Sequence, residues 1–327
     1  MHPHAREIWF TREISMKYIV TGGAGFIGSH IVEELAHKRH DVVIIDNLFS
    51  GKSENIGPFL DREKVRFVKG SITDLPLLKE LFQGADGIFH QAAIASVPRS
   101  IDNPVATNEA NVTGTLNVLV AARDAGVRRI VFASSSAVYG DTPTLPKRED
   151  MTPNPRSPYA VSKLAGEQYL RVFSEVYGIG TISLRYFNVF GPRQDPDSPY
   201  AAVIPRFITG ILHHRSPTIF GDGEQTRDFT YVKDVVQANI RAMESDAQGV
   251  FNVAYCRQIS IQELAALIME ITGISVPLSF EPQRMGDIRD SCADIHRAAD
   301  AFGYSPKFTV RSGLEETVRW YQQQLQQ

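Results

Sequence analysis

Tyr159 and Lys163 are the residues of this sequence whose types and spacing could do chemistry. They lie four positions apart in Ser157-Pro158-Tyr159-Ala160-Val161-Ser162-Lys163. On a helix, side chains four apart share a face with β-carbons about 5 to 6 Å apart, so Lys163 can hold its charge near the phenol of Tyr159. A nearby cation lowers a tyrosine pKa from its ordinary value of about 10. The pair predicts a general base, although ordinary surface helices also carry this spacing.

A run of three serines could supply a partner for Tyr159. Ser134-Ser135-Ser136 follows directly after the strand-like residues 129–133, and the helix expected to carry Tyr159 begins one loop later. A serine hydroxyl and the phenol should therefore meet at one edge of a sheet. A nucleophilic serine is the alternative, but no G-x-S-x-G motif surrounds the run and no histidine is placed to activate it. We predict a hydrogen-bonding role.

A glycine-rich loop near the N-terminus has the context of a dinucleotide site. The strand-like residues 17–21 precede Gly22-Gly23-Ala24-Gly25-Phe26-Ile27-Gly28, and residues 29–38 have a helical composition. Glycines between a strand and a helix permit a tight turn and close approach of a pyrophosphate to the helix N-terminus.

Asp46 ends the next strand-like run, residues 41–45, and lies 18 positions after Gly28. An acid at this distance can accept hydrogen bonds from the adenosine ribose, and it disfavours the extra phosphate of NADP. A solvated aspartate at a strand end is the alternative. Together with the glycine loop, Asp46 predicts NAD as the cofactor.

The chain alternates between strand-like and helical segments up to about residue 190. The expected strands are residues 65–68, 87–90, 129–133 and 181–186, and the expected helices are residues 75–82, 108–125 and 159–177. This alternation predicts an α/β fold with a Rossmann-type, doubly wound parallel sheet and ligands outside the carboxyl ends of the strands. We expect residues 16–190 to be mainly an NAD-binding domain, and residues 1–15 to be a disordered extension or an alternative start.

The regular alternation stops after Asn188, where residues 191–199 are rich in Pro, Asp and Arg. Residues 191–327 are expected to be mainly a smaller mixed α/β substrate domain, whose segments can interleave with the first. Its expected helices are residues 201–213, 232–243, 261–272 and 310–325. Arg227 and Arg284 lie in or beside its loops, and paired arginines suit a diphosphate.

Composition narrows the class of protein. The chain has 327 residues, a formal net charge of -3 and 43% hydrophobic residues, which fits a globular protein with no general attraction to nucleic acid or anionic membranes. It has two cysteines, no apolar run long enough for a membrane span and no metal-spaced Cys/His cluster. We predict a cytoplasmic protein without a disulfide framework.

Four motifs occur in the order and spacing of one family: residues 21–28, residues 134–140, Tyr159-x-x-x-Lys163 and Arg185-Tyr186-Phe187-Asn188. Together they resemble the extended short-chain dehydrogenase/reductase superfamily, and within it the nucleotide-sugar 4-epimerases. The resemblance runs from Lys17 to the C-terminus. It implies a Rossmann domain that holds NAD, a smaller domain that holds a UDP-sugar, and a site in the cleft between them.

The resemblance also implies site residues. Its catalytic residues are Tyr159, Lys163 and Ser135. Besides Tyr159 and Lys163, the cofactor residues that it implies are Gly22, Gly25, Phe26, Ile27, Gly28, Asp46, Asn47, Ser71, Ile72, Gln91, Ala92, Ala93, Asn111 and Tyr186. The implied substrate residues are Ser96, Ser135, Ser136, Asn188, Val203, Arg227, Arg284, Asp287 and Ser291. One departure is Ser71, where many relatives carry Asp. No metal is expected.

Two positions narrow the expected reaction. Ser136-Ala137 stand where related dehydratases and decarboxylases carry acids, so simple 4-epimerisation through a 4-keto sugar is expected. Ser291 stands where glucose-only epimerases carry a bulky Tyr, and a small residue leaves room for an N-acetyl group. We expect interconversion of UDP-N-acetylglucosamine and UDP-N-acetylgalactosamine, with UDP-glucose and UDP-galactose as a second pair.

Other readings stay open at this point. The nearest are a UDP-glucuronate 4-epimerase and a UDP-glucose-only epimerase, and a reading of another class is a non-catalytic NAD sensor. The resemblance further implies a homodimer, paired through the helices expected at residues 108–125 and 159–177.

Overall fold

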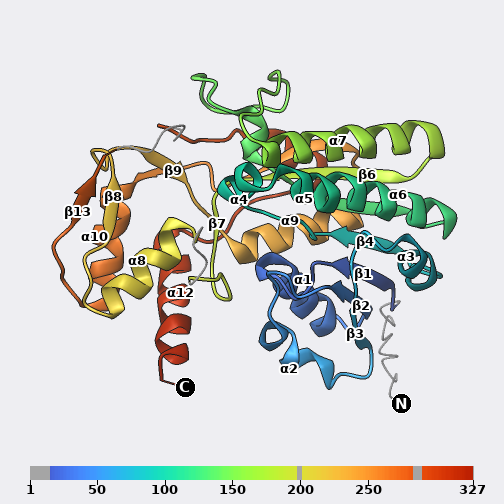
Figure 1. Cartoon of the computed structure of the whole chain (residues 1–327), viewed down its shortest axis with the longest axis horizontal. Helices are drawn as coiled ribbons and strands as arrows, with labels where there is room; N and C mark the ends of the chain where they lie inside the picture. The colour runs from blue at the N-terminus through green and yellow to red at the C-terminus, as the bar shows by residue number, and fades with distance from the viewer. Residues whose placement is uncertain (1–14, 197–200, 283–288, 327) are drawn as a thin grey trace, which may run out of the picture.

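Seven parallel strands form the central sheet of the protein, for which a computed structural model describes residues 15–196, 201–282 and 289–326 (Figure 1). The strand order is β11-β6-β5-β4-β1-β2-β3. The bounds are β1 Lys17–Thr21, β2 Asp41–Asp46, β3 Val65–Lys69, β4 Gly87–His90, β5 Arg129–Ser135, β6 Gly180–Tyr186 and β11 Gly249–Val253. The predicted Rossmann-type α/β class is confirmed.

Helices cover both faces of this sheet because its strands are apolar on both sides. In β1, Ile19 packs with one buried cluster and Val20 with the other, as the alternation of side chains along a strand requires. One face is covered by α1 (Phe26–His37), α9 (Val232–Glu244) and α11 (His296–Phe302). The opposite face is covered by α3 (Leu75–Leu81), α6 (Gly114–Asp124) and α7 (Pro158–Tyr177).

The two parts of the chain interleave. Strand β11 was not predicted, and it extends the sheet by pairing in parallel with β6, so that Phe251 lies opposite Leu184. Helix α9, expected in the second region, packs on the same sheet face as α1. Residues on both sides of position 190 therefore build the sheet.

The segment before α6 also differs from expectation. One helix was predicted over residues 108–125, but α4 (Val97–Asp102), α5 (Pro104–Asn108) and a π-helical turn (Glu109–Thr113) precede α6. Prolines at the starts of α4 and α5 are compatible with a first helical turn, and the side chains of Ser96 and Asn103 cap these helices.

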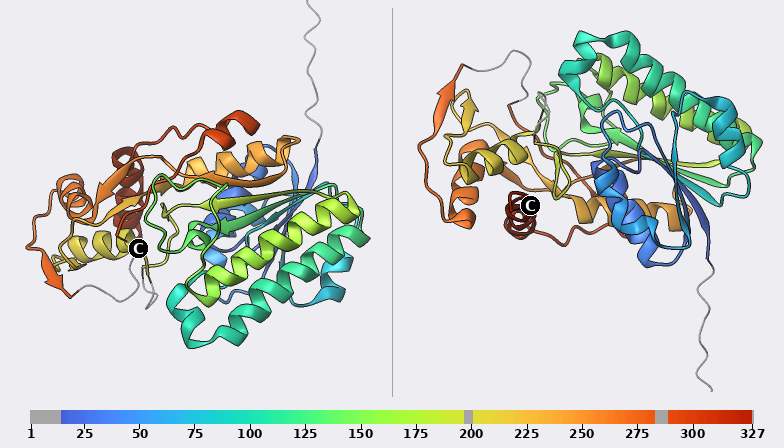
Figure 2. Two further views of the ribbon diagram at one scale, coloured as in Figure 1. Left: turned by 90° about the horizontal axis from the view of Figure 1, so that it is seen from above. Right: turned by 60° about the horizontal axis from the view of Figure 1, so that its bottom comes forward.

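The smaller part lies beyond the carboxyl ends of the strands, where β6 leads into β7 (Val189–Phe190) (Figures 1 and 2). Its core is made by α8 (Val203–Leu212), α10 (Ile261–Thr272) and α12 (Val310–Gln324). Three two-stranded ladders complete it: β7 with β10 (Thr230–Tyr231), β8 (Thr218–Phe220) with β13 (Ser279–Glu281), and β9 (Thr226–Asp228) with β12 (Gln258–Ser260).

Helix α10 shows why some bounds were predictable. It has the expected bounds, because Ser260 caps its start and Glu263 completes a capping box, while Gly273 ends it in the left-handed conformation. None of the helices that the structure describes is long and apolar enough to cross a membrane.

Candidate active site

The end of β5 contacts α7 through the residues that the sequence singled out. The Lys163 ammonium donates to the carbonyl oxygen of Ala133 at 2.8 Å, and the phenol of Tyr159 shares a hydrogen bond with the Ser135 hydroxyl. The Lys163 nitrogen lies 5.9 Å from the centre of the Tyr159 ring. The predicted group of Ser135, Tyr159 and Lys163 is therefore brought together at one strand end.

The electrostatics of the pair differ from the simple expectation. Burial raises the pKa of Tyr159, and the hydrogen bond with Ser135 only partly opposes this effect. Burial also lowers the pKa of Lys163 to about 7, against the attraction of the Glu167 carboxylate. The expectation that Lys163 would pull down the pKa of Tyr159 is thus not met by the protein's own groups.

A hydrogen-bonded network centred on Asn111 holds the first turn of α7. The Asn111 amide donates to the Ser162 hydroxyl at 3.0 Å and to the Ile94 carbonyl at 3.2 Å, and it accepts from the Ile94 amide at 2.8 Å. Ser162 in turn donates to the Tyr159 carbonyl at 2.7 Å. Asn111, which lies in the π-helical turn, therefore ties the loop after β4 to the helix that carries Tyr159.

His90, at the end of β4, was missed by sequence reasoning. Its ring nitrogens lie 2.7 Å from the Thr21 hydroxyl and 2.9 Å from the Thr115 hydroxyl. Burial lowers the pKa of His90 to about 3, and the nearby Lys163 charge adds to this effect. A neutral His90 thus joins β1, which precedes the glycine loop, to α6. In the sequence, the one signal for a role of His90 was its position at the end of a predicted strand.

The glycine loop packs so closely against neighbouring backbone that side chains would not fit. Gly22 has a φ of +69°, and a β-carbon there would lie 2.6 Å from the backbone nitrogen of Ala92. A β-carbon on Gly28 would collide with the carbonyl oxygen of Gly22. Because helix α1 begins at Phe26, this loop leads directly into a helix N-terminus, which suits the diphosphate of NAD.

Asp46 lies where the ribose of a dinucleotide is expected. It is 8% exposed, and its carboxylate accepts from the Ala24 amide at 3.0 Å and the Leu48 amide at 2.8 Å. Burial raises the pKa of Asp46, which these two amides oppose. The exposed Asn47 follows it directly. A fixed acid at the end of β2 fits the adenosine end of NAD.

The other expected cofactor residues lie along the same edge of the sheet. Gln91 donates to the Tyr186 phenol at 3.2 Å and to Asn239 at 3.1 Å, which links β4 to β6 and α9. Ser71 hydrogen-bonds Thr73 at 2.8 Å, and Ile72 is buried beside it. The remaining residues of this expected set fall in α1 or in the loop after β4; these are Phe26, Ile27, Ala92 and Ala93.

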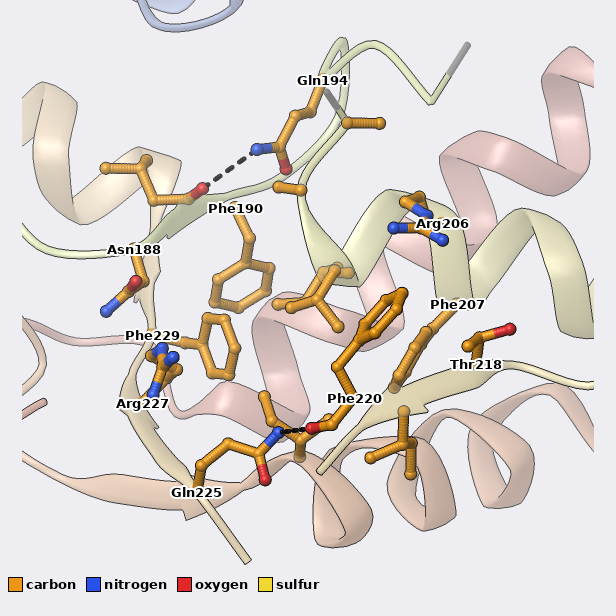
Figure 3. Close-up of a pocket in the computed structure, with 17 residues that line it drawn as sticks. Asn188, Phe190, Gln194, Arg206, Phe207, Thr218, Phe220, Gln225, Arg227 and Phe229 are labelled. Atoms are coloured by element: carbon orange, nitrogen blue, oxygen red, sulfur yellow. Dashed lines mark hydrogen bonds between the residues drawn. The ribbon is translucent and has the colours of Figure 1, made fainter. Parts of the chain in front are cut away.

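A cavity of about 290 Å³ opens in the smaller part (Figure 3). Its walls carry four aromatic rings, those of Phe190, Phe207, Phe220 and Phe229, and polar groups at its rim. The lining residues are Asn188, Val189, Phe190, Gln194, Ala201, Ala202, Val203, Ile204, Arg206, Phe207, Thr218, Ile219, Phe220, Gln225, Arg227, Phe229 and Ile261. Among them are three of the predicted substrate residues: Asn188, Val203 and Arg227.

Asn188 marks the junction between the cavity and the strand ends. It follows β6, which is the neighbour of β5, and has a φ of +34°, in the left-handed region. Its amide donates to the Asp228 carbonyl at 3.0 Å and to the Ser291 hydroxyl at 3.4 Å. The structure thus brings Asn188 and Ser291 together.

The expected diphosphate clamp is described only in part. The Arg227 guanidinium donates to the carbonyl oxygens of Thr226 at 2.8 Å and Arg289 at 3.0 Å. Arg284 and Asp287 lie outside the described residues. Ser96 caps α4, and Ser136 begins a 3₁₀ turn after β5; neither lines the cavity beside Arg227.

Three buried residues behind the catalytic group were also missed. Ser134 donates to Glu167 at 2.5 Å, and Arg185 donates to both oxygens of Glu167 at 2.9 and 2.7 Å. The Glu167 and Arg185 side chains are 1% and 3% exposed. The signal for Glu167 was its position, since it continues the spacing of four from Tyr159 and Lys163.

Comparison with known proteins now fixes the family. The model of the NAD dependent epimerase/dehydratase family matches residues 18–254. The chain belongs to this family. The resemblance to nucleotide-sugar 4-epimerases predicted from the motifs is confirmed, and with it an NAD-dependent enzyme.

Individual relatives of this epimerase/dehydratase cover nearly the whole chain. A UDP-glucose 4-epimerase of Mycolicibacterium smegmatis is 41% identical, over 95% of this chain and 100% of the relative. The structure of a UDP-N-acetylglucosamine 4-epimerase from Methanobrevibacter ruminantium M1, in complex with UDP-N-acetylmuramic acid, matches with a TM-score of 0.92 and 43% identity, over 95% and 99% of the two chains. A UDP-glucuronic acid 4-epimerase from Bacillus cereus, solved with UDP-glucuronic acid and NAD, matches with a TM-score of 0.88 and 33% identity, over 94% and 100%.

The crowding at Gly22 makes a prediction about the cofactor. Gly22→Ala should abolish NAD retention, because its β-carbon would press against the backbone of Ala92. Gly84→Ala is the matched control, since Gly84 has the same φ of +69° with nothing within 4 Å of the added carbon. NAD bound per chain after gel filtration is the measurement. Equal NAD contents in the two variants would show that NAD binding does not depend on the close packing at Gly22.

Proposed function

We propose that the substrates of this 4-epimerase are UDP-N-acetylglucosamine and UDP-N-acetylgalactosamine, with UDP-glucose and UDP-galactose as a second pair. The proposal is carried by one observation. Ser135, Tyr159 and Lys163 meet at the end of β5, next to the strand that leads to Asn188 and the small Ser291. An acid/base group and a sugar position without a bulky side chain thus lie at neighbouring strand ends.

Proton transfer is the task of the chain's own residues. When bound, NAD supplies a hydride acceptor for carbon 4 of the sugar and a positive charge that favours the phenolate. Tyr159 takes the proton of the 4-hydroxyl and gives it back when the hydride returns to the opposite face. Ser135 holds the oxygen that loses this proton, and the Lys163 cation stabilises the phenolate.

The cavity is suited to the nucleotide end of the substrate. A flat base can lie against the rings of Phe207 and Phe220, and the Gln225 amide beside them supplies polar edges. This amide is held by its 2.6 Å hydrogen bond to the Phe220 carbonyl (Figure 3). Arg227 at the rim supplies a cation for the diphosphate. We place the uridine in this cavity and the sugar toward Asn188.

The role of Tyr159 is tested by removing its hydroxyl. Tyr159→Phe should lower kcat at least about a hundredfold, the low end of what a general acid/base contributes. Tyr169→Phe is the control, because Tyr169 is on the same helix and 36% exposed. Turnover is followed by separating the C4 epimers. A Tyr159→Phe variant that keeps more than about a hundredth of the activity would refute the assignment of Tyr159 as the acid/base.

The role of Ser291 is tested by filling its space. Ser291→Tyr should reduce turnover of UDP-N-acetylglucosamine by about tenfold or more while UDP-glucose is still turned over, since the ring would occupy the N-acetyl position. Ser291→Ala, which stays small, should keep both activities. NMR of the products identifies the epimers. Failure of the wild-type protein on the N-acetyl sugar, or no selective loss in Ser291→Tyr, would overturn this substrate choice.

We also propose a homodimer, as the relatives' helix pairing implies. Figure 2 shows α6 and α7 side by side on an outer face of the molecule. Apolar side chains are exposed on α7 and on the adjoining α4 and α5, and these are Val161 at 52%, Val172 at 40%, Val176 at 64%, Ile101 at 61% and Val105 at 76%. A second copy of the same face would cover them.

Val105→Glu combined with Val176→Glu should convert the dimer to a monomer, because each charge would lie in the apolar contact. Phe280→Glu is the control, since Phe280 is 52% exposed on β13, away from these helices. Sedimentation at micromolar concentration measures the change. A wild-type monomer would refute the proposed dimer.

A further inference from the structure

The buried contacts between β5 and α7 extend one turn beyond the catalytic group. Three consecutive residues of β5 each bind α7 at positions four apart. Ser135 binds Tyr159, Ala133 binds Lys163, and Ser134 binds Glu167. The proposed acid/base pair is therefore part of a row of three helix side chains, and the third member carries a negative charge.

We propose that Glu167 is a positioning residue for the epimerase reaction, whose buried carboxylate keeps Lys163 cationic beside Tyr159. This inference rests on the proposed function of Tyr159 and Lys163. Glu167 is one helical turn from Lys163 on the same face of α7, and its charge acts on Lys163 through space, raising the pKa that burial lowers. In a buried site, such a charge is weakly screened by solvent.

The Glu167 carboxylate is fixed rather than free to turn. Arg185 binds both of its oxygens, and Ser134 donates to one of them at 2.5 Å. Arg185 lies directly opposite Ser134 in the β5–β6 pair, so both partners reach α7 from the same level of the sheet. A fixed carboxylate can act on Lys163 without a conformational change.

Lys163 needs such a partner because its surroundings disfavour a charge. It is 3% exposed, and it packs over the Phe132 ring with its nitrogen 4.9 Å from the ring centre. Burial moves the pKa of Lys163 down to about 7, and the Glu167 charge opposes this change. Without the carboxylate, the pKa of Lys163 should lie lower still.

The other titratable groups around Lys163 do not replace Glu167. His90 on β4 is neutral, since burial lowers its pKa to about 3, and burial raises the pKa of Tyr186 on β6. Tyr159 on α7 has a raised pKa as well. Arg185 on β6 is positive and paired with Glu167. Among these described neighbours, Glu167 is the one anion.

The sign of the expected effect follows directly. Glu167→Gln removes an attraction for the protonated amine, so Lys163 should lose its proton at lower pH. The alkaline limb of the kcat/KM profile should move down by about one pH unit or more, within the range that a single neighbouring charge produces. Activity near the acidic limb should change less, because Lys163 is still protonated there.

The matched control lies on the same helix. Glu175 pairs with Arg171 at 2.8 Å, but both side chains are more than half exposed, at 58% and 59%. Glu175→Gln makes the same change in an exposed pair and should leave the profile where it is. Ser134→Ala removes a hydrogen bond to Glu167 and keeps the charge, so it should shift the limb much less than Glu167→Gln. Glu167→Asp keeps a carboxylate, so its alkaline limb should lie close to that of the wild type.

A direct titration separates this inference from the proposed reaction. In protein with ¹³C-labelled lysine, the ε-carbon signal that disappears in Lys163→Arg reports the protonation of Lys163. Its midpoint should fall by about one pH unit or more in Glu167→Gln and stay unchanged in Glu175→Gln. An unchanged midpoint would overturn the role of Glu167 even if the enzyme is an epimerase, whereas absence of epimerisation by the wild type would sink the proposed function alone.

Folding of the variant is also controlled. Glu167→Gln leaves the Arg185 guanidinium buried without its carboxylate, which destabilises the fold. The double variant Glu167→Gln/Arg185→Met removes both charges and avoids this cost. Its Lys163 midpoint should still fall, but by less than in Glu167→Gln, because loss of the Arg185 cation removes a repulsion. A folded double variant with the wild-type midpoint would refute the inference.

Discussion

The contact between the end of β5 and the face of α7 is the constraint on which the site depends. It brings a carbonyl and two hydroxyls of successive strand residues to three successive turns of the helix, through Lys163, Tyr159 and Glu167. A parallel strand and its following helix are held in one register by these bonds. A shift of the helix by one residue would break all three, so the register also fixes where the phenol lies.

Burial in this contact disfavours the charged forms of both Tyr159 and Lys163. The low-dielectric surroundings raise the pKa of Tyr159 and lower that of Lys163, and either change works against a phenolate beside an ammonium. The proposed reaction therefore depends on charge from other groups: the Glu167 carboxylate on the same helix, and the positive charge that NAD would supply when bound.

Much of the fold could be predicted from local sequence. Glycine spacing, Asp46 and the alternation of apolar segments indicate the sheet and its cofactor edge, and the caps of α10 fix its bounds. What could not be predicted depends on contacts far apart in the chain. Strand β11 is short and becomes a strand only through β6. The pairing of Arg185 with Glu167 likewise requires the sheet and helix to be assembled first.

The candidate site, like the fold, could be predicted from the sequence only in part. The types and spacing of Tyr159 and Lys163 predict a pair, and the structure places Ser135 with it. The direction of the Tyr159 pKa could not be read from spacing, because it depends on how deeply the ring is packed. Asn188 and Ser291 meet only because the chain returns to β6 after more than a hundred residues.

The place of β11 at the edge of the sheet has a consequence for the two parts of the chain. A fragment that ended at residue 190 would leave the outer edge of β6 unpaired, and the sheet face under α9 would be bare. Open backbone groups on an apolar strand are a template for pairing with other chains, so such a fragment would aggregate. The first 190 residues are thus not an independent folding unit, because strand β11 and helix α9 complete the sheet.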